Sequence, residues 1–340
     1  MRVFIGFLST AVLSLGAATS GKPAAKPLTP TAPKQGVKTP GVQMPFAQIK
    51  ADATLATPDK PTWMYFAPAG PGALYAPAAD KVLKFEAKAN KPVDPIPAVK
   101  KPCGGAVNAF ASLWIPACGD GTLLRLDPRT LKVKATIQTG AADLHSSIAA
   151  SPDSVWIIAD GKQTILRIDP DQDAVVAELR VPPGCANLTF AETSLWLTCP
   201  DNKVLRINPA TNLIDKRIDV GANPVSLVSG QGAIWVFCGK EGKIDRLDPK
   251  TDKVTKSIEL LTPDTTGALA FGEGFLWVTQ PGFPLTRIDV TAEKEKVVQQ
   301  FWGEGGGAIL SSAGALWISN LNSGTISRID PKLVLATLAE

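Results

Sequence analysis

The sequence predicts an all-β protein, a seven-bladed β-propeller of four-stranded antiparallel blades, and three observations carry this prediction. Tryptophan recurs at steps of 42, 40, 39, 42 and 40 residues, and each Trp lies between apolar residues. About ten residues later comes a basic residue, an aliphatic one, Asp or Asn, and usually Pro. A period of about 40 residues with several short strands in each unit is typical of propeller blades. The six tryptophans are Trp114, Trp156, Trp196, Trp235, Trp277 and Trp317.

A degenerate seventh copy precedes these six. Tyr75 lies 39 residues before Trp114, and "KVLKFEA" stands where the other copies have the basic string. Seven copies predict seven blades from about Pro61 to Glu340, which leaves no room for a second core in a chain of 340 residues. We expect one propeller domain over residues 46–340.

Each copy divides into four predicted strands. In the fifth copy these are "PVSLVS", "AIWVFC", "KIDRLD" and "KVTKSIEL", and the turn signals "GKEG" and "DPKT" flank the third strand. The strand that holds the Trp is apolar on both faces, as a strand covered on both sides requires. We therefore interpret the tryptophans as core residues between blades, with a ligand cage of stacked rings as the alternative.

An arginine recurs in every complete copy, two residues before an Asp or Asn. Residues two apart on a strand share a face. We predict that these arginines form ion pairs or stack their guanidinium groups at the blade junctions. They are Arg125, Arg167, Arg206, Arg246, Arg287 and Arg328.

The ring of blades must be closed by one of the two ends of the chain. "VLATLAE" at the C-terminus is one candidate for the outer strand of the seventh blade. Residues 46–58 also resemble such a strand, and we predict that this N-terminal segment pairs beside the last blade.

The first 45 residues differ from the rest of the chain. Residues 1–20 read as a secretory signal, with Arg2, an apolar run and small residues before Gly21. Residues 21–45 are rich in Pro, Lys, Ala and Thr, and we expect a disordered linker, a solvated spacer or a basic tail that associates with anionic cell-envelope polymers. The sequence thus predicts a secreted or periplasmic protein, with no transmembrane segment after cleavage of the signal.

The net charge of +4 comes from this basic tail. Residues 1–50 hold six basic residues and no acidic one, so the remainder has 29 basic and 31 acidic residues. A propeller without excess positive charge does not support nucleic-acid binding.

The five cysteines follow the repeat. Cys103 and Cys185 lie eleven residues before their blade's Trp, and Cys118 and Cys199 lie four and three residues after it. These positions open and close two antiparallel neighbouring strands, so their ends come together. In an exported chain we predict the disulfides Cys103–Cys118 and Cys185–Cys199. Cys238 remains as a free thiol.

His145 is the only histidine, and it also lies eleven residues before its blade's Trp. In propellers this position opens the innermost strand at the channel mouth, so His145 is the candidate catalytic residue. Imidazole is able to act as a general base or metal ligand near neutral pH, and a polar loop residue is the alternative. Further candidates for binding at the mouth come from the neighbouring connections: Asp143, Asp160, Asp264, Gln280 and Asn320.

The strings "GALWISN", "GTISRIDP", "GAIWVFC" and "KIDRLDP" resemble the repeats of the streptogramin lyase (virginiamycin B lyase) superfamily and of YVTN-type propellers, over about residues 61–340. The resemblance implies the propeller fold. The activity of the lyases depends on several histidines and glutamates that bind a divalent metal and act as base. Here His145 stands alone, and positions after the blade aromatic where the lyases typically have Glu hold Ala117, Ala159, Cys199, Cys238, Gln280 and Asn320.

Three functional hypotheses follow. The first is an exported propeller that binds an unidentified small molecule or protein at its channel mouth, as a monomer and without a cofactor or metal. The second is a streptogramin-lyase-like or lactonase-like enzyme that uses His145, with Mg²⁺ or Ca²⁺ only in this case. The third is a structural role in the cell envelope through the basic tail.

Overall fold

The computed structural model describes residues 34–37, 43–68, 72–96, 99–141, 147–159, 163–291 and 295–337. These residues all belong to one compact unit, Ala32–Glu340. The predicted signal, most of the predicted linker and the site candidates Asp143, His145 and Asp160 lie outside the described residues. In the described part of the chain, no helix has the length and apolar character needed to cross a membrane.

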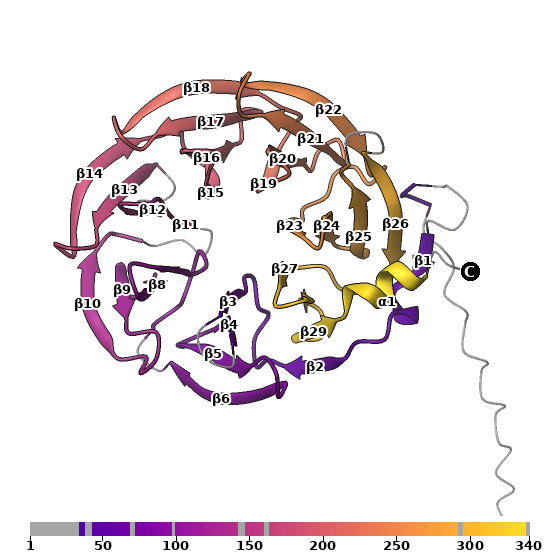
Figure 1. Cartoon of the computed structure of the whole chain (residues 1–340), viewed down its shortest axis with the longest axis horizontal. Coiled ribbons are helices and arrows are strands. Elements are labelled where there is room, and N and C mark those ends of the chain that lie inside the picture. The colour runs from indigo at the N-terminus through magenta and orange to yellow at the C-terminus, as the bar shows by residue number, and fades with distance from the viewer. Residues whose placement is uncertain are drawn as a thin grey trace, which may run out of the picture. The chain divides into compact units, whose positions relative to one another are not determined.

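Seven sheets follow one another around a ring (Figure 1). In blades 1 to 5 the first strand lies nearest the axis and the fourth lies outermost, whereas β1 (Gln43–Pro45) and β2 (Ala53–Ala56) from the N-terminal end lie outermost in blades 6 and 7. The four strands of each blade are antiparallel, so the predicted fold class is confirmed, and blade 6 carries a fifth strand in addition. Blade 1 contains β3 (Tyr65–Ala67), β4 (Ala73–Ala78), β5 (Lys81–Glu86) and β6 (Lys91–Ile96). Blade 2 contains β7 (Val107–Ala109), β8 (Ser112–Ala117), β9 (Thr122–Leu126) and β10 (Val133–Gln138). Blade 3 contains β11 (Ile148–Ala150), β12 (Val155–Ala159), β13 (Thr164–Asp169) and β14 (Ala174–Arg180).

The remaining blades repeat this pattern. Blade 4 contains β15 (Ala186–Ala191), β16 (Ser194–Cys199), β17 (Lys203–Asn208) and β18 (Leu213–Asp219). Blade 5 contains β19 (Pro224–Gly230), β20 (Ala233–Cys238), β21 (Lys243–Asp248) and β22 (Lys253–Glu259). Blade 6 contains β23 (Ala268–Gly272), β24 (Phe275–Gln280), β25 (Phe283–Asp289) and β26 (Lys296–Trp302). Blade 7 contains β27 (Ile309–Ser312), β28 (Ala315–Asn320) and β29 (Thr325–Ile329).

The outer strand of blade 7 comes from the N-terminal end of the chain. Strand β2 (Ala53–Ala56) pairs antiparallel with β29, and the backbone N–H of Thr57 donates to the Gly324 carbonyl at 2.8 Å. Leu55 on this strand is buried. The first blade-forming strand in the sequence therefore completes the last blade.

The C-terminal alternative for ring closure is wrong, because residues 331–336 form the helix α1 (Pro331–Ala336). The Asp330 carboxylate accepts the Lys332 backbone N–H at 2.9 Å and Pro331 occupies the first turn, so the Asp-Pro pair starts a helix here. In other blades the same pair begins a turn into the outermost strand. Strand β2 already holds that place in blade 7, and Val334 of α1 is instead buried against the core.

Part of the predicted linker has a defined position on blade 6, which corrects the expectation of disorder up to residue 45. Strand β1 (Gln43–Pro45) runs parallel to β26 as a fifth strand, and the short 3-10 helix η1 (Phe46–Gln48) follows it. The backbone N–H of Val37 donates to Oε1 of the buried Gln300 at 2.8 Å. Apolar groups such as Val37 and Met44, packed against buried clusters, give this stretch the contacts that a solvated spacer lacks.

The six repeated tryptophans are almost completely buried, each between the sheets of neighbouring blades. In five blades the arginine stacks on the Trp of its own blade, as at Arg125 over Trp114, where the guanidinium carbon lies 5.1 Å from the ring centroid. In blade 6, Arg287 stacks on Phe275 instead. The guanidinium of Arg125 also donates to Asp173 of the next blade at 2.8 Å. The predicted roles of the arginines, stacking and ion pairing at junctions, are thus combined in one side chain.

The turns between the third and fourth strands of a blade are held by the Asp or Asn that follows the arginine. The Asp127 carboxylate accepts the backbone N–H groups of Thr130 and Arg129 at 2.8 and 3.0 Å. These hydrogen bonds to the charged form lower the pKa of Asp127 to about 2.

The turns between the first two strands of several blades require a left-handed backbone three residues before the Trp. Gly232 and Gly314 supply it without strain, whereas Thr193 adopts φ +62° with a branched side chain. We expect Thr193→Gly to raise the free energy of unfolding by about 0.5–1 kcal/mol. Gly232→Ala should lower the free energy of unfolding by a similar amount, because an added Cβ meets no atom within 4 Å and only the backbone strain remains. Urea midpoints that shift in the same direction for both variants would contradict this assignment.

Candidate functional site

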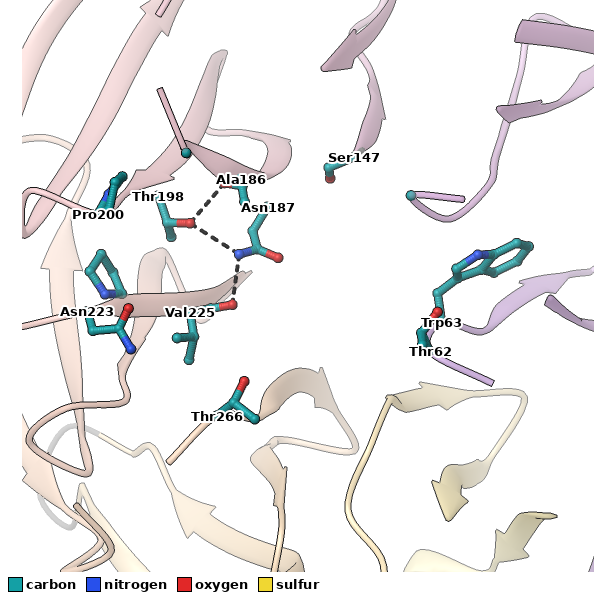
Figure 2. Close-up of a pocket in the computed structure, with 13 residues that line it drawn as sticks. Thr62, Trp63, Ser147, Ala186, Asn187, Thr198, Pro200, Asn223, Val225 and Thr266 are labelled. Carbon is teal, nitrogen blue, oxygen red and sulfur yellow. Dashed lines mark hydrogen bonds between the residues drawn. The ribbon is translucent and has the colours of Figure 1, made fainter. Parts of the chain in front are cut away.

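A cavity of about 360 Å³ lies where the innermost strands begin. Its lining comes from six successive blades, which places it at the predicted channel mouth, and Figure 2 shows its lining residues. The residues are Thr62, Trp63, Gly104, Ser147, Gly184, Ala186, Asn187, Thr198, Pro200, Asn223, Pro224, Val225 and Thr266.

The wall of the cavity is held by hydrogen bonds that pass from one blade to the next. Ser147 Oγ donates to the Leu188 carbonyl at 3.3 Å and accepts the Leu188 N–H at 3.0 Å, which joins blades 3 and 4. Ser226 Oγ accepts the Leu269 N–H at 3.2 Å, which joins blades 5 and 6. These contacts fix the backbone at the mouth before any ligand arrives.

Asn187 joins blades 4 and 5 and depends on two irregularities in the strands. The pairing of β15 with β16 shifts between Ala186 and Leu188, so Asn187, at φ +55°, stands outside the ladder. A similar shift in β19 leaves Val225 outside its ladder. Asn187 Nδ2 therefore donates to the Val225 carbonyl at 2.7 Å and to Thr198 Oγ1 at 3.1 Å.

The described lining is polar and carries no charged side chain. Hydroxyl and amide groups lie among glycine, proline and alanine, so the described surface offers hydrogen bonds from uncharged side chains. Trp63 is the one large aromatic group in this lining. Its side chain is 9% exposed, and its Nε1 has no hydrogen-bond partner within the described part of the chain.

None of the three described residues that were predicted to bind at the mouth belongs to the cavity lining. Asp264, two residues before the lining residue Thr266, is exposed and pairs with Lys240. Gln280 is fully buried, and its Nε2 donates to Thr262 Oγ1 at 2.8 Å. Asn320 Oδ1 accepts backbone N–H groups of its own turn.

The sequence carried a signal for some of the residues that line the cavity. Two lining residues, Ser147 and Asn187, lie nine residues before the Trp of their blade, as does Ser226 beside the lining residue Val225. They are the polar members of a position that other blades fill with Gly, Ala or Phe. Trp63 also stands apart, since it is one of two tryptophans outside the 40-residue period. Thr198 and Asn223 carry no comparable signal.

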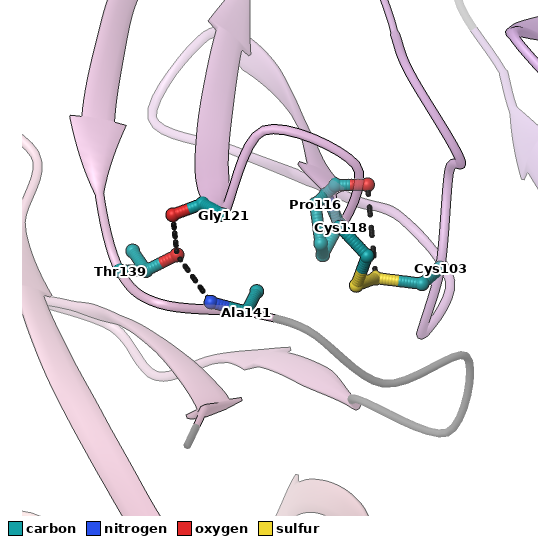
Figure 3. The surroundings of a disulfide bond; sticks show 6 residues. All are labelled: Cys103, Pro116, Cys118, Gly121, Thr139 and Ala141. Atoms are coloured by element: carbon teal, nitrogen blue, oxygen red, sulfur yellow. Dashed lines mark hydrogen bonds between the residues drawn. A yellow bond between two sulfur atoms is a disulfide. The ribbon is translucent and has the colours of Figure 1, made fainter. Parts of the chain in front are cut away.

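Two disulfides involve residues next in sequence to the cavity lining. Cys103 joins Cys118 and Cys185 joins Cys199, with Cα–Cα distances of 5.9 and 4.0 Å (Figure 3 shows the first pair). Each cysteine of the second pair directly adjoins lining residues, as does Cys103. In the chain-entropy model, bridges of this loop length stabilise a fold by about 3 kcal/mol each.

Cys238 is fully buried and free, and its thiol donates to Asp245 Oδ2 at 3.6 Å. Burial, followed by the nearby Asp245 charge, raises the pKa of the thiol well above its ordinary value. We expect no reaction with a thiol reagent in the folded protein and one equivalent in the unfolded, unreduced protein. Five equivalents without reductant would contradict both disulfides.

Among the described residues, no group of three or more His, Cys, Asp or Glu is placed to hold a metal ion. The polar side chains of the described lining are neutral hydroxyl and amide groups, which are not the carboxylate and imidazole sets of strong divalent sites. The geometry described here is thus that of a pre-formed hydrogen-bonding pocket.

No family model matches the chain, and no curated protein matches it. The fold is shared with the crystal structure of selenomethionine-substituted virginiamycin B lyase from Staphylococcus aureus, at 16% identity and a TM-score of 0.66, over 82% of this chain and 98% of that one. A streptogramin B lyase structure matches at 16% identity and a TM-score of 0.65, over 81% and 96%. A chain of the mitotic checkpoint complex matches at 11% identity and a TM-score of 0.70, over 95% and 99%. The resemblance inferred from the repeats is therefore confirmed as a likeness of fold.

Proposed function

We propose that this propeller is an exported binding module that holds a small molecule in the cavity where its innermost strands begin. The observation that carries the proposal is the cavity lining, in which Ser147 and Asn187 link blades 3, 4 and 5 by hydrogen bonds. Ser226, beside the lining residue Val225, continues these links to blade 6. Such pre-organisation reduces the ordering cost of binding. The volume of about 360 Å³ lies in the range of about 300–1,000 Å³ that small-molecule sites occupy.

Export is part of the same proposal. The N-terminal sequence reads as a secretory signal, and two disulfides suit an oxidising compartment. Periplasmic or extracellular fractions that contain the processed chain would support this; a cytoplasmic protein with the signal intact would oppose it.

The test of binding is a small-molecule panel screened by ligand-observed NMR against the oxidised protein. Thr266 is exposed at the cavity, so Thr266→Trp should fill the site and abolish binding without disturbing the core. Thr251→Trp, in an exposed turn of blade 5, is the matched control and should leave binding unchanged. Ligands that bind both variants equally would place recognition elsewhere on the molecule.

A lyase-like or lactonase-like enzyme is the second candidate. It is favoured by the likeness of fold to two structures of streptogramin lyases. It is also favoured by the cavity lining residue Ser147, which lies two residues after His145 in the sequence. The test is turnover of lactones and cyclic depsipeptides, with and without Mg²⁺, by the wild type and by His145→Ala. Turnover that His145→Ala abolishes would establish the enzyme, whereas a chain inert toward the panel with and without Mg²⁺ would favour the binding module.

A further inference from the structure

A short segment near the N-terminus, residues 35–37, lies against blades 5 and 6 in the way that a bound peptide lies on its receptor. The Gly36 N–H donates at 2.8 Å to the carbonyl of Leu261, which stands in the connection between β22 and β23. The Gln35 carbonyl accepts a hydrogen bond from Nε2 of Gln43, on β1, at 2.8 Å. These contacts recognise the main chain of the segment, as peptide-binding sites do.

The side-chain amide of Gln300 is oriented by two backbone groups. Its Nε2 donates to the Leu260 carbonyl at 3.3 Å, and because a carbonyl oxygen can only accept, Oε1 is the atom left for a donor. Oε1 accepts the Val37 N–H at 2.8 Å. Gln300 is fully buried, so removal of the segment would leave this acceptor without its partner. The amide therefore forms part of a site that requires a peptide N–H.

The side chain of Val37 gives the segment an apolar anchor. It packs against the buried cluster between blades 5 and 6, which includes Ile258, Leu260 and Val297. The site thus combines hydrogen bonds to the peptide backbone with a place for one small aliphatic side chain.

The position before this anchor accepts only glycine, for two independent reasons. Gly36 is buried and has φ +91°, a backbone conformation that side chains disfavour. An added Cβ would also lie 2.3 Å from Gln43 Nε2, 2.6 Å from Gln300 Oε1 and 2.9 Å from Phe283 Cε1. A larger residue would therefore displace the same two amides that hold the backbone on either side of it.

We propose that these groups form a peptide-binding site, separate from the cavity, which the chain fills with its own residues 35–37. The ligand class is a peptide with glycine followed by a small aliphatic residue, and Gly36 determines the specificity. The filled site is a strap that holds the N-terminal segment at Leu261, five residues before the cavity lining residue Thr266. A tethered segment has an effective concentration of the order of millimolar, so even a weak site stays filled.

The experiment frees the site in the full-length processed, oxidised protein and then offers the segment in trans. Gly36→Val should displace the strap, and Val37→Asp should do so independently, because it would place a carboxylate against the apolar cluster. The probe is a synthetic peptide of residues 30–38. Its titration is followed by ¹H–¹⁵N NMR of the Gln300 side-chain amide, whose signals are assigned by their loss in Gln300→Met. We expect saturable binding to both variants and none to the wild type, whose site is filled.

Two controls separate the role of the glycine from general effects of the substitution. The same peptide carrying Gly36→Val should bind the freed site at least about tenfold more weakly. Gly274→Val is the matched protein control, because Gly274 also has a positive φ, +77°, but an added Cβ there meets no atom within 4 Å. That protein should keep the strap in place and bind no peptide, and thermal melts show that each variant is folded.

Each contrary result removes a defined part of the proposal. Gln300 signals that stay as in the wild type in both folded variants would overturn the strap. Freed variants that do not bind the native peptide, or binding that is equal in the wild type, would overturn the peptide site. Equal binding of the Gly36→Val peptide would overturn the specificity for glycine. The test of the cavity by Thr266→Trp is independent of all these outcomes.

Discussion

A chain that begins at residue 59 should be less stable by about 3–6 kcal/mol than one that begins at residue 34. The shorter chain lacks β1, η1 and β2, and with them the buried side chains of Ile49 and Leu55. Burial of each aliphatic side chain contributes about 1.5–3 kcal/mol. The loss also exposes β29 as an unpaired edge in blade 7.

The measurement is the free energy of unfolding from urea denaturation of the two oxidised chains, supported by thermal melts. Removal of residues 1–33 alone is the control and should not change the transition, because the contacts of Gly36 and Val37 with blades 5 and 6 are kept. Equal stability of the two truncated chains would show that β2 does not hold the ring closed.

Trp235→Ala should lower the free energy of unfolding by about 3–5 kcal/mol, as large-to-small changes of buried aromatic residues do. Trp235 is fully buried in one cluster with Leu276 and Val278 of the next blade. The change leaves a cavity between blades 5 and 6 and removes the ring on which Arg246 stacks at 5.9 Å.

Leu213→Ala is the matched control, because that side chain is 61% exposed and its loss should cost less than about 0.5 kcal/mol. Circular dichroism of the urea-induced transition measures both. If Trp235→Ala were as stable as the wild type, the interpretation of the repeated tryptophans as core residues would be contradicted, and the alternative, a ligand cage, would be favoured.

The blades were predictable from the sequence because one physical requirement repeats in it. A sheet covered on both sides needs an apolar strand with a large side chain at its centre, and the Trp period records this seven times when Tyr75 is included. The start of α1 was not predictable from its local sequence. Asp330-Pro331 has the same form as the turn in other blades, and only the presence of β2 decides between strand and helix.

The cavity was less predictable, because its geometry depends on irregularities in the strands. Asn187 reaches the Val225 carbonyl because both residues stand outside their ladders, and a residue pattern does not show such a shift. Gln280 was expected at the mouth from its place after the Trp, yet it is buried at the end of β24. A polar residue in a connection therefore predicts the cavity lining poorly, whereas a residue that departs from the repeat, such as Trp63, predicts it better.

The pairing of β2 with β29 has a consequence for how the protein forms. The two partners, such as Leu55 and Ile326, are separated by most of the chain, so this contact carries a high entropic cost of loop closure and cannot form until the last blade exists. A chain that is synthesised from its N-terminus therefore keeps β2 unpaired until β29 has been made. We therefore expect the ring of blades to close in one late folding step, when β2 pairs with β29, and to stay open until then.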